Sequence, residues 1–187
     1  MERQNSADGI LPVTWGNFFG NMDWDNFNIS KFGIKELPTE DYPVSNPTGN
    51  LDFNTLNEDG TYNKIDSIDQ LKSIQSVGGY LDLWRLDLTN IDGLKNLESV
   101  RSWLHISNNK LTNVDGLSSL TSVGGNFSLK DNPSLENIEG ASNIKVGDFI
   151  EIDDTYDGPK LSSDSTFCSQ NDESQFILAP KTQVCEA

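Results

Sequence analysis

The chain has 187 residues, of which 13 are basic and 29 acidic, so its formal net charge is −16. This negative charge repels phosphate backbones and anionic lipid headgroups, so we expect neither nucleic-acid binding nor docking to an anionic membrane. With 35% hydrophobic residues the chain can bury a core as one domain, yet it has no run of about 18 apolar residues, and no segment is expected to insert into a bilayer.

The first residues are polar and no apolar stretch follows them, so we expect no secretory leader in this numbering. An aromatic cluster interleaved with Gly, Asn and Asp follows, made of Trp15, Phe18, Phe19, Trp24, Phe27 and Phe32. These residues either cap the open end of a repetitive core or form an arm that docks on a protein partner. The need to cover an exposed end favours the cap, and both alternatives assign residues 1–50 to an N-terminal unit.

Residues 43–50 contain two prolines and a glycine and predict a turn-rich joint. After it, Leu51 and Phe53 alternate with Asp52 and predict a degenerate first strand. Residues 57–63 interrupt the pattern that follows and predict a surface loop.

Four segments within residues 77–152 share one apolar pattern. They begin 23 residues apart, and the fourth and sixth residues after each start are also apolar; the starts are Val77, Val100, Val123 and Val146. Apolar positions two apart predict a short strand with one buried face. Counting the strand at 51–53, the chain forms about five coils, more than the minimum of about three for a stable stack.

Between the strands the apolar residues recur every three positions, as in Leu88, Ile91, Leu94 and Leu97. This spacing favours 3₁₀ turns or extended coil over a long α-helix. A glycine follows an acidic residue at each return, at Gly93, Gly116 and Gly140, and is expected to supply a left-handed bend.

The stretch 104–111, LHISNNKL, has the form LxLxxNxL, and 127–135 has the same form with one residue inserted. Together with VGG before the strand and DGL after it, these residues resemble leucine-rich repeats, in particular the short repeats of receptor-L-domain-like proteins, over about residues 65–152. The resemblance implies an α/β-type solenoid, mostly β and coil: a right-handed leucine-rich-repeat coil with a short parallel β-sheet and irregular caps. It also implies extracellular or surface recognition.

The repeat asparagine is present only as Asn109 and Asn132, since Leu86 and Thr155 occupy its place in the first and fourth units. We therefore expect a buried asparagine ladder of two rungs, each satisfied by nearby backbone.

Alternation places a second set of side chains on the outer face of the sheet. The three columns are Tyr80, Trp103, Asn126 and Phe149; Asp82, His105, Ser128 and Glu151; and Trp84, Ser107, Lys130 and Asp153. Large aromatics beside acids indicate a contact surface for a protein or for sugar rings, unless a terminal segment covers it. The predicted binding face comprises Tyr80, Asp82, Trp84, Trp103, His105, Lys130, Phe149 and Glu151.

Sequence signals for chemistry are few. His105 is the only histidine and no GxSxG motif accompanies it, so we expect no enzyme and no cofactor. Asp153, Asp157 and Asp164 follow part of an EF-hand-like calcium spacing, but Thr155 and Pro159 break the pattern, and a solvated acidic turn is the preferred interpretation.

Residues 51–161 are expected to form the solenoid and 162–187 a C-terminal cap, with residues 176–180 supplying the covering surface. The cap holds Cys168 and Cys185, which either form a disulfide or remain reduced in the core. N-x-S/T sequons occur at Asn28 and Asn126, and a glycan on Asn126 would obstruct the predicted face.

The sequence thus predicts a non-enzymatic recognition or structural module. The first expectation is display on a larger assembly, such as a phage or virus particle, for decoration or host-surface attachment, with protein partners and surface glycans as ligands. The alternative is a secreted or cell-surface bacterial adhesin, and the third is a calcium-dependent or sugar-cleaving enzyme.

Overall fold

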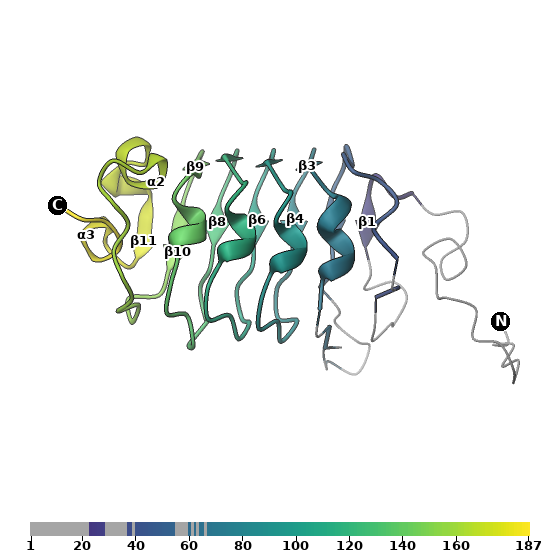
Figure 1. The fold of residues 1–187 in the computed structure, drawn as a ribbon, viewed down its shortest axis with the longest axis horizontal. Helices are drawn as coiled ribbons and strands as arrows, with labels where there is room; N and C mark the ends of the chain where they lie inside the picture. Colours follow the sequence, from purple (N-terminus) through teal and green to yellow (C-terminus); the bar gives the residue numbers. More distant parts are fainter. Residues whose placement is uncertain are drawn as a thin grey trace, which may run out of the picture.

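The computed structural model describes residues 23–28, 37–38, 40–54, 60, 62, 64–65 and 67–187. These residues form mostly strands and coil, with parallel sheets and few helices (Figure 1). The predictions that concern Trp15, Phe18, Phe19 and Phe32, and most of the loop at 57–63, lie outside the described residues.

The larger sheet has seven strands, all paired in parallel, in the order β1-β2-β4-β6-β8-β10-β11. The strands are β1 (Phe27–Asn28), β2 (Leu51–Asp52), β4 (Leu81–Asp82), β6 (Leu104–His105), β8 (Phe127–Ser128), β10 (Ile150–Ile152) and β11 (Phe176–Leu178). The predicted strands of the repeats and the degenerate strand at residues 51–53 are confirmed. In this register the same position of each repeat lies beside its equivalent in the next.

A second parallel sheet of four strands was not expected. It consists of β3 (Ser76–Val77), β5 (Ser99–Val100), β7 (Ser122–Val123) and β9 (Lys145–Val146). The chain bends between its two strands in each repeat, at Gly78-Gly79 in the first. A Cβ on Gly79 would lie 2.7 Å from the Gly49 carbonyl oxygen, so the neighbouring coil leaves no room for a side chain there.

The return path is a short 3₁₀ helix in each unit, as the spacing of three predicted. These helices are η2 (Asp69–Ser73), η3 (Asp92–Leu94), η4 (Asp115–Leu117) and η5 (Glu139–Ala141). They follow one another along the side of the molecule opposite the larger sheet (Figure 1). The C-terminal part adds α2 (Thr166–Gln170), η6 (Glu173–Gln175) and α3 (Lys181–Val184).

The prediction that glycines bend the chain to the left at each return is wrong. Among the described glycines only Gly60 has a positive φ. The left-handed residues of the repeats lie a few positions after the strands and are Arg85, Asp87, Asn108 and Asp131. Asn and Asp tolerate this conformation because their short polar side chains bond locally. Gly116 is needed for a different reason: a Cβ there would lie 2.6 Å from the Ile91 carbonyl carbon of the preceding coil.

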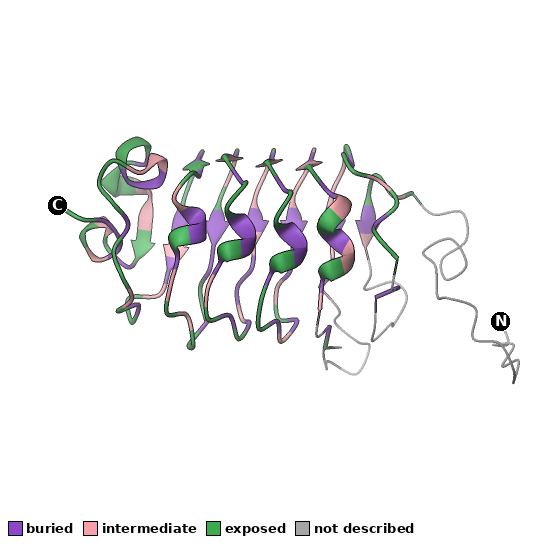
Figure 2. Cartoon of the chain, in the orientation of Figure 1, coloured by how far each residue is buried: buried purple, intermediate pink, exposed green. Residues whose placement is uncertain are grey.

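The core runs continuously between the sheets and the 3₁₀ helices (Figure 2). The expected two-rung asparagine ladder is confirmed, because Asn109 and Asn132 are each about 3% exposed and fully bonded to backbone. A third buried asparagine, Asn171, was not expected. It accepts a hydrogen bond from Val146 N and donates one to Ile144 O. Its amide therefore pairs backbone groups where the C-terminal segment meets β9, as Asn109 and Asn132 do in the repeats.

The N-terminal unit belongs in part to the sheet. Phe27 lies in β1, is 1% exposed and pairs with Leu51, which is 24 residues later in the chain. Trp24 stacks on Phe27 at a centroid distance of 5.8 Å and packs edge-on against Tyr42. These contacts favour the cap over the docking arm for Trp24 and Phe27, because Phe27 is buried within the chain and Trp24 is half-buried against it.

The C-terminal segment covers the last coil and extends the sheet by β11. Phe176 packs edge-on against Phe167, and Ala179 is buried. Ile177 and Leu178 were also expected to cover the core, but they are 37% and 48% exposed. A disulfide joins Cys168 to Cys185, whose Cα atoms are 5.8 Å apart.

Candidate functional site: the outer face of the seven-stranded sheet

The residues that alternate with the buried positions of the seven-stranded sheet form its outer face. The strand register places Asp52, Asp82, His105, Ser128 and Glu151 in one row across β2 to β10. Because neighbouring strands are only about 4.8 Å apart, each side chain of this row lies beside the next. The row therefore forms a continuous surface from residues far apart in sequence.

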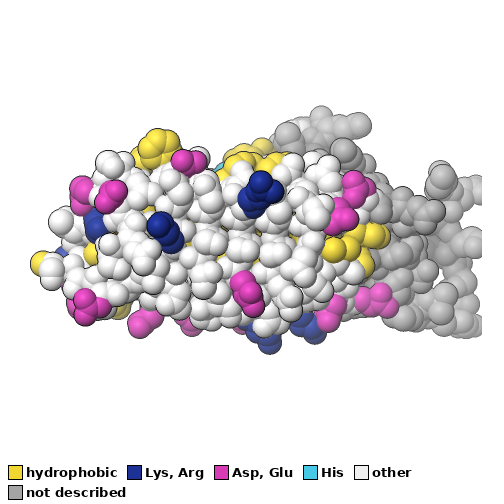
Figure 3. Space-filling model, turned by 90° about the horizontal axis from the view of Figure 1, so that it is seen from above, with side chains coloured by type: hydrophobic (Ala, Val, Ile, Leu, Met, Phe, Trp, Pro, Cys, Tyr) yellow, Lys and Arg dark blue, Asp and Glu magenta, His cyan; other side chains and the backbone are white. Residues whose placement is uncertain are grey.

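Aromatic rings stand along this row on one half of the sheet, and we call Tyr62, Tyr80, Trp84, Trp103 and His105 the aromatic strip. Tyr80 and Trp103 stack with centroids 4.1 Å apart and planes at 8°. His105 meets Trp103 edge-on at 5.9 Å and stacks on Trp84 at 6.3 Å. All five are half-buried, so each has a packed side and a side that faces solvent. Figure 3 shows hydrophobic side chains gathered beside the histidine, coloured cyan, at one border of the molecule.

Tyr62 extends the strip, since its ring contacts Trp84 edge-on at 5.3 Å. The guanidinium of Arg85 lies 4.2 Å from the centroid of the Tyr62 ring, a cation–π contact. Sequence reasoning missed Tyr62 because it lies in the insertion that has no counterpart in the repeats, and no pattern marked it.

Two carboxylates lie below the rings. Asp82 is 8% exposed, so it is not displayed as predicted; its Oδ1 accepts a hydrogen bond from Trp84 N at 2.9 Å and lies 3.5 Å from His105 Nδ1. Beside it, burial raises the pKa of Asp52 to about 6, the hydrogen bond from Asn54 N opposes this rise, and the charge of Asp82 adds to it. Asp82 therefore supports the strip from beneath, whereas Asp52 accepts hydrogen bonds from Asn28 Nδ2 and Asn54 N.

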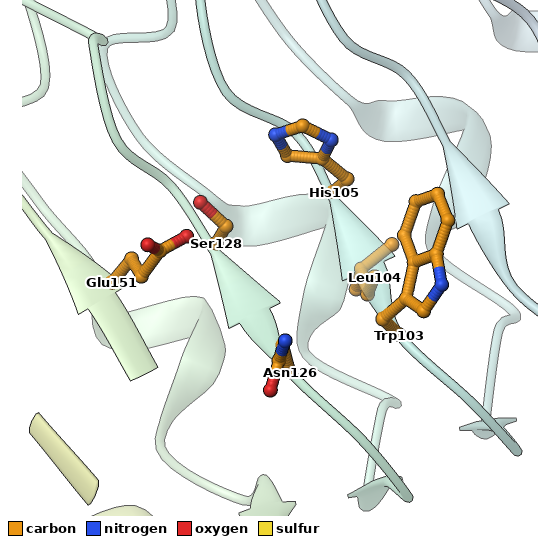
Figure 4. Close-up of a pocket in the computed structure, with 6 residues that line it drawn as sticks. All are labelled: Trp103, Leu104, His105, Asn126, Ser128 and Glu151. Carbon is orange, nitrogen blue, oxygen red and sulfur yellow. The ribbon is translucent and has the colours of Figure 1, made fainter. Parts of the chain in front are cut away.

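A hollow of about 220 Å³ lies next to the strip, over β8. It is lined by Trp103, Leu104, His105, Asn126, Ser128 and Glu151 (Figure 4). It exists because the outward side chains of Asn126, just before β8, and Ser128, in β8, are short. The outward side chains at β6 on one side and at β10 on the other are longer. Trp103 stands on one side of the floor and Glu151 on the opposite side (Figure 4).

No family model, curated protein or solved structure matches this chain. Its function must therefore be inferred from the face itself. The structure brings Tyr80, Trp84, Trp103 and His105 together as the strip. Glu151 lies across the hollow, and Phe149, two residues before it, is 50% exposed.

Lys130, also predicted for the face, is exposed, and its Nζ lies 4.0 Å from Asp131 Oδ2. Asn126 appeared in the predicted columns but not among the chosen site residues. Its short side chain is what leaves the space, a feature visible only once its taller neighbours on both sides are known.

Asp82, His105 and Ser128 are neighbours in the register, in the order of acid, imidazole and hydroxyl that a nucleophilic triad uses. The Ser128 hydroxyl, however, is 2.6 Å from the Ser107 hydroxyl and Ser128 is 4% exposed. Either hydroxyl can donate in this bond, and among the described residues no hydrogen bond joins Ser128 to the imidazole, so the row shows no activated nucleophile.

The calcium candidates do not assemble. Within the described part of the chain, no three His, Cys, Asp or Glu side chains are grouped as metal ligands, and this applies to Asp153, Asp157 and Asp164. Asp153 instead accepts a hydrogen bond from Asp131 N at 2.7 Å and so ties two adjacent turns together. Among the same residues, no helix is long and apolar enough to cross a membrane.

Proposed function

We propose that this protein is a non-enzymatic recognition module, a leucine-rich-repeat-type solenoid that binds its ligand on the outer face of the seven-stranded sheet. The observation that carries the proposal is the aromatic strip, in which the stacked pair Tyr80 and Trp103 stands half-exposed on a rigid sheet. Aromatic side chains supply large contact area and lose little conformational entropy on binding, which is why they dominate recognition surfaces.

The support below the strip adds to this argument. Asp82 bonds Trp84 N and faces His105, and the stacking of each ring on its neighbour limits its movement. A surface whose rings are already held in place binds with a smaller ordering cost than a flexible loop. The strip is therefore suited to recognition by contact.

Two settings for this module follow from the chain. The first is display on a larger assembly, such as a phage or virus particle. In that case the N-terminal unit would contact the assembly through Trp15, Phe18 and Phe19, since Trp24 and Phe27 pack within the chain. The second is a secreted or cell-surface adhesin. The bond between Cys168 and Cys185 favours this second setting, because disulfides persist in oxidising compartments.

The proposal can be tested by NMR on the isotope-labelled full chain, titrated with small probes that include phenol and neutral methyl glycosides. The chain has four tryptophans, and their indole N–H signals resolve the face residues Trp84 and Trp103 from the others. We expect at least one probe to shift the Trp84 and Trp103 signals in a saturable way, and Trp103→Ala to remove the effect while the circular dichroism stays native.

Lys95, exposed next to η3 on the opposite side, provides the control variant Lys95→Ala, which should bind like the wild type. Probe shifts concentrated around η3 and η4, with the strip unaffected, would overturn the proposal.

A further inference from the structure

The hollow over β8, which we call the β8 slot, has an apolar wall on one side and polar groups around it. Trp103 forms the wall, Glu151 stands opposite, His105 lies at one end and Asn126 at the other (Figure 4). Its volume of about 220 Å³ corresponds to about seven water molecules. This is the scale of a single small ring and not of a folded peptide segment.

The slot contains both hydrogen-bond donors and hydrogen-bond acceptors. Asn126 Oδ1 accepts a bond from Phe149 N at 3.2 Å, which fixes the orientation of the amide and directs its two N–H donors elsewhere. The Glu151 carboxylate supplies acceptors, whereas Trp103 contributes ring surface, because its indole nitrogen lies on the edge of the ring away from Asn126 and Glu151 (Figure 4). No protein group in the described structure bonds the Asn126 amide nitrogen or the Glu151 carboxylate, so both can bond a ligand.

This combination discriminates between ligand classes. A cationic side chain has only donors, so it would satisfy Glu151 but would face the Asn126 donors unfavourably. An anion is repelled by Glu151 and by the net charge of −16. A neutral sugar ring fits both requirements, because its hydroxyls donate and accept while its C–H face is apolar and stacks on an aromatic ring.

We propose that the β8 slot binds one neutral pyranose residue of a glycan, stacked on Trp103 with its hydroxyls bonded by Asn126 and Glu151. This inference rests on the proposed function of the face and names its ligand class. For a single ring of about twelve non-hydrogen atoms in an open slot, the expected dissociation constant is in the millimolar range, on the order of 1–10 mM. A longer glycan could continue over Phe149, which is half-exposed beside the slot.

The test uses the full chain produced without N-glycosylation, since Asn126 lies in a sequon. Methyl glucoside, methyl galactoside, methyl mannoside and N-acetylglucosamine are titrated separately while the Trp103 indole signal is followed. The decisive variant is Asn126→Asp, which keeps the shape and the acceptor for Phe149 N but replaces the two donors by an acceptor.

We expect at least one sugar to bind with a millimolar constant, and both Asn126→Asp and Glu151→Gln to weaken it at least fivefold. Lys95→Ala should leave binding unchanged. Equal sugar binding by wild type and Asn126→Asp, or no saturable shift with any of the four sugars, would overturn the inference. If phenol shifts the Trp103 signal and no sugar does, the proposed binding face is supported and the sugar proposal is refuted. If neither phenol nor any sugar shifts this signal, both proposals are refuted.

Discussion

The buried amide of Asn109 offers the most stringent test of how the coils are held together. Its Oδ1 accepts hydrogen bonds from Leu86 N and Leu88 N, both at 3.1 Å, and its Nδ2 donates to Leu83 O at 2.9 Å. Further bonds reach Ile106 O and Ser107 O, which have other partners as well. Replacement by leucine would therefore leave three buried backbone groups without a partner.

Each such group costs about 1–3 kcal/mol, so Asn109→Leu is expected to lower the free energy of unfolding by about 4 kcal/mol, near the low end of the sum because the turn can relax. Leucine itself is accommodated at this repeat position, since Leu86 occupies it one unit earlier and is fully buried. Asn132→Leu would leave only Leu111 N and Leu129 O unpaired and should cost about 2 kcal/mol.

Urea unfolding followed by both circular dichroism and tryptophan fluorescence would measure the two variants. Coincident transitions are needed first, because stacked repeats can lose two-state behaviour. If Asn109→Leu cost less than about 1 kcal/mol, or less than Asn132→Leu, then the count of orphaned backbone groups would not explain the stability of the turns.

Three further predictions address other contacts. Gly116→Ala should lower the unfolding free energy by about 2–4 kcal/mol, because its Cβ would overlap the Ile91 carbonyl group; an unchanged urea midpoint would contradict this. The folded pKa of Asp52, raised to about 6, favours its protonated form, so this group's stability is present below about pH 4 and is lost as the pH rises through 6. Asp52→Asn should therefore flatten the stability profile between pH 4 and 7 and gain about 1 kcal/mol at pH 7, a figure reduced for the partial exposure of the carboxyl, whereas an unaltered profile would assign the pH dependence to other groups. Reducing the bond between Cys168 and Cys185 should cost about 3 kcal/mol, measured by urea unfolding with and without reductant, and equal midpoints would contradict it.

The constant step of 23 residues determined the parallel strands, their register and the position of the 3₁₀ returns, because an internal repeat forces equivalent residues to stack. The buried roles of Asn109 and Asn132 could be predicted for the same reason. The second sheet could not, since its strands are only two residues long and their pairing depends on how closely the coils approach. The function of Gly116 was misassigned because a close approach between coils leaves no mark on local sequence.

The outward columns were predictable from alternation, but only the tertiary structure decided what each member does. Asp82 and Trp84 alternate with buried residues in the same way, yet Asp82 is covered and Trp84 is displayed, because the rings on neighbouring strands close over the shorter side chain. The short side chains of Asn126 and Ser128 become the floor of a slot only between taller residues 23 positions away on each side. Sequence thus determines which residues face outward, whereas the heights of neighbours brought together by stacking determine which of them form a surface that a ligand can reach.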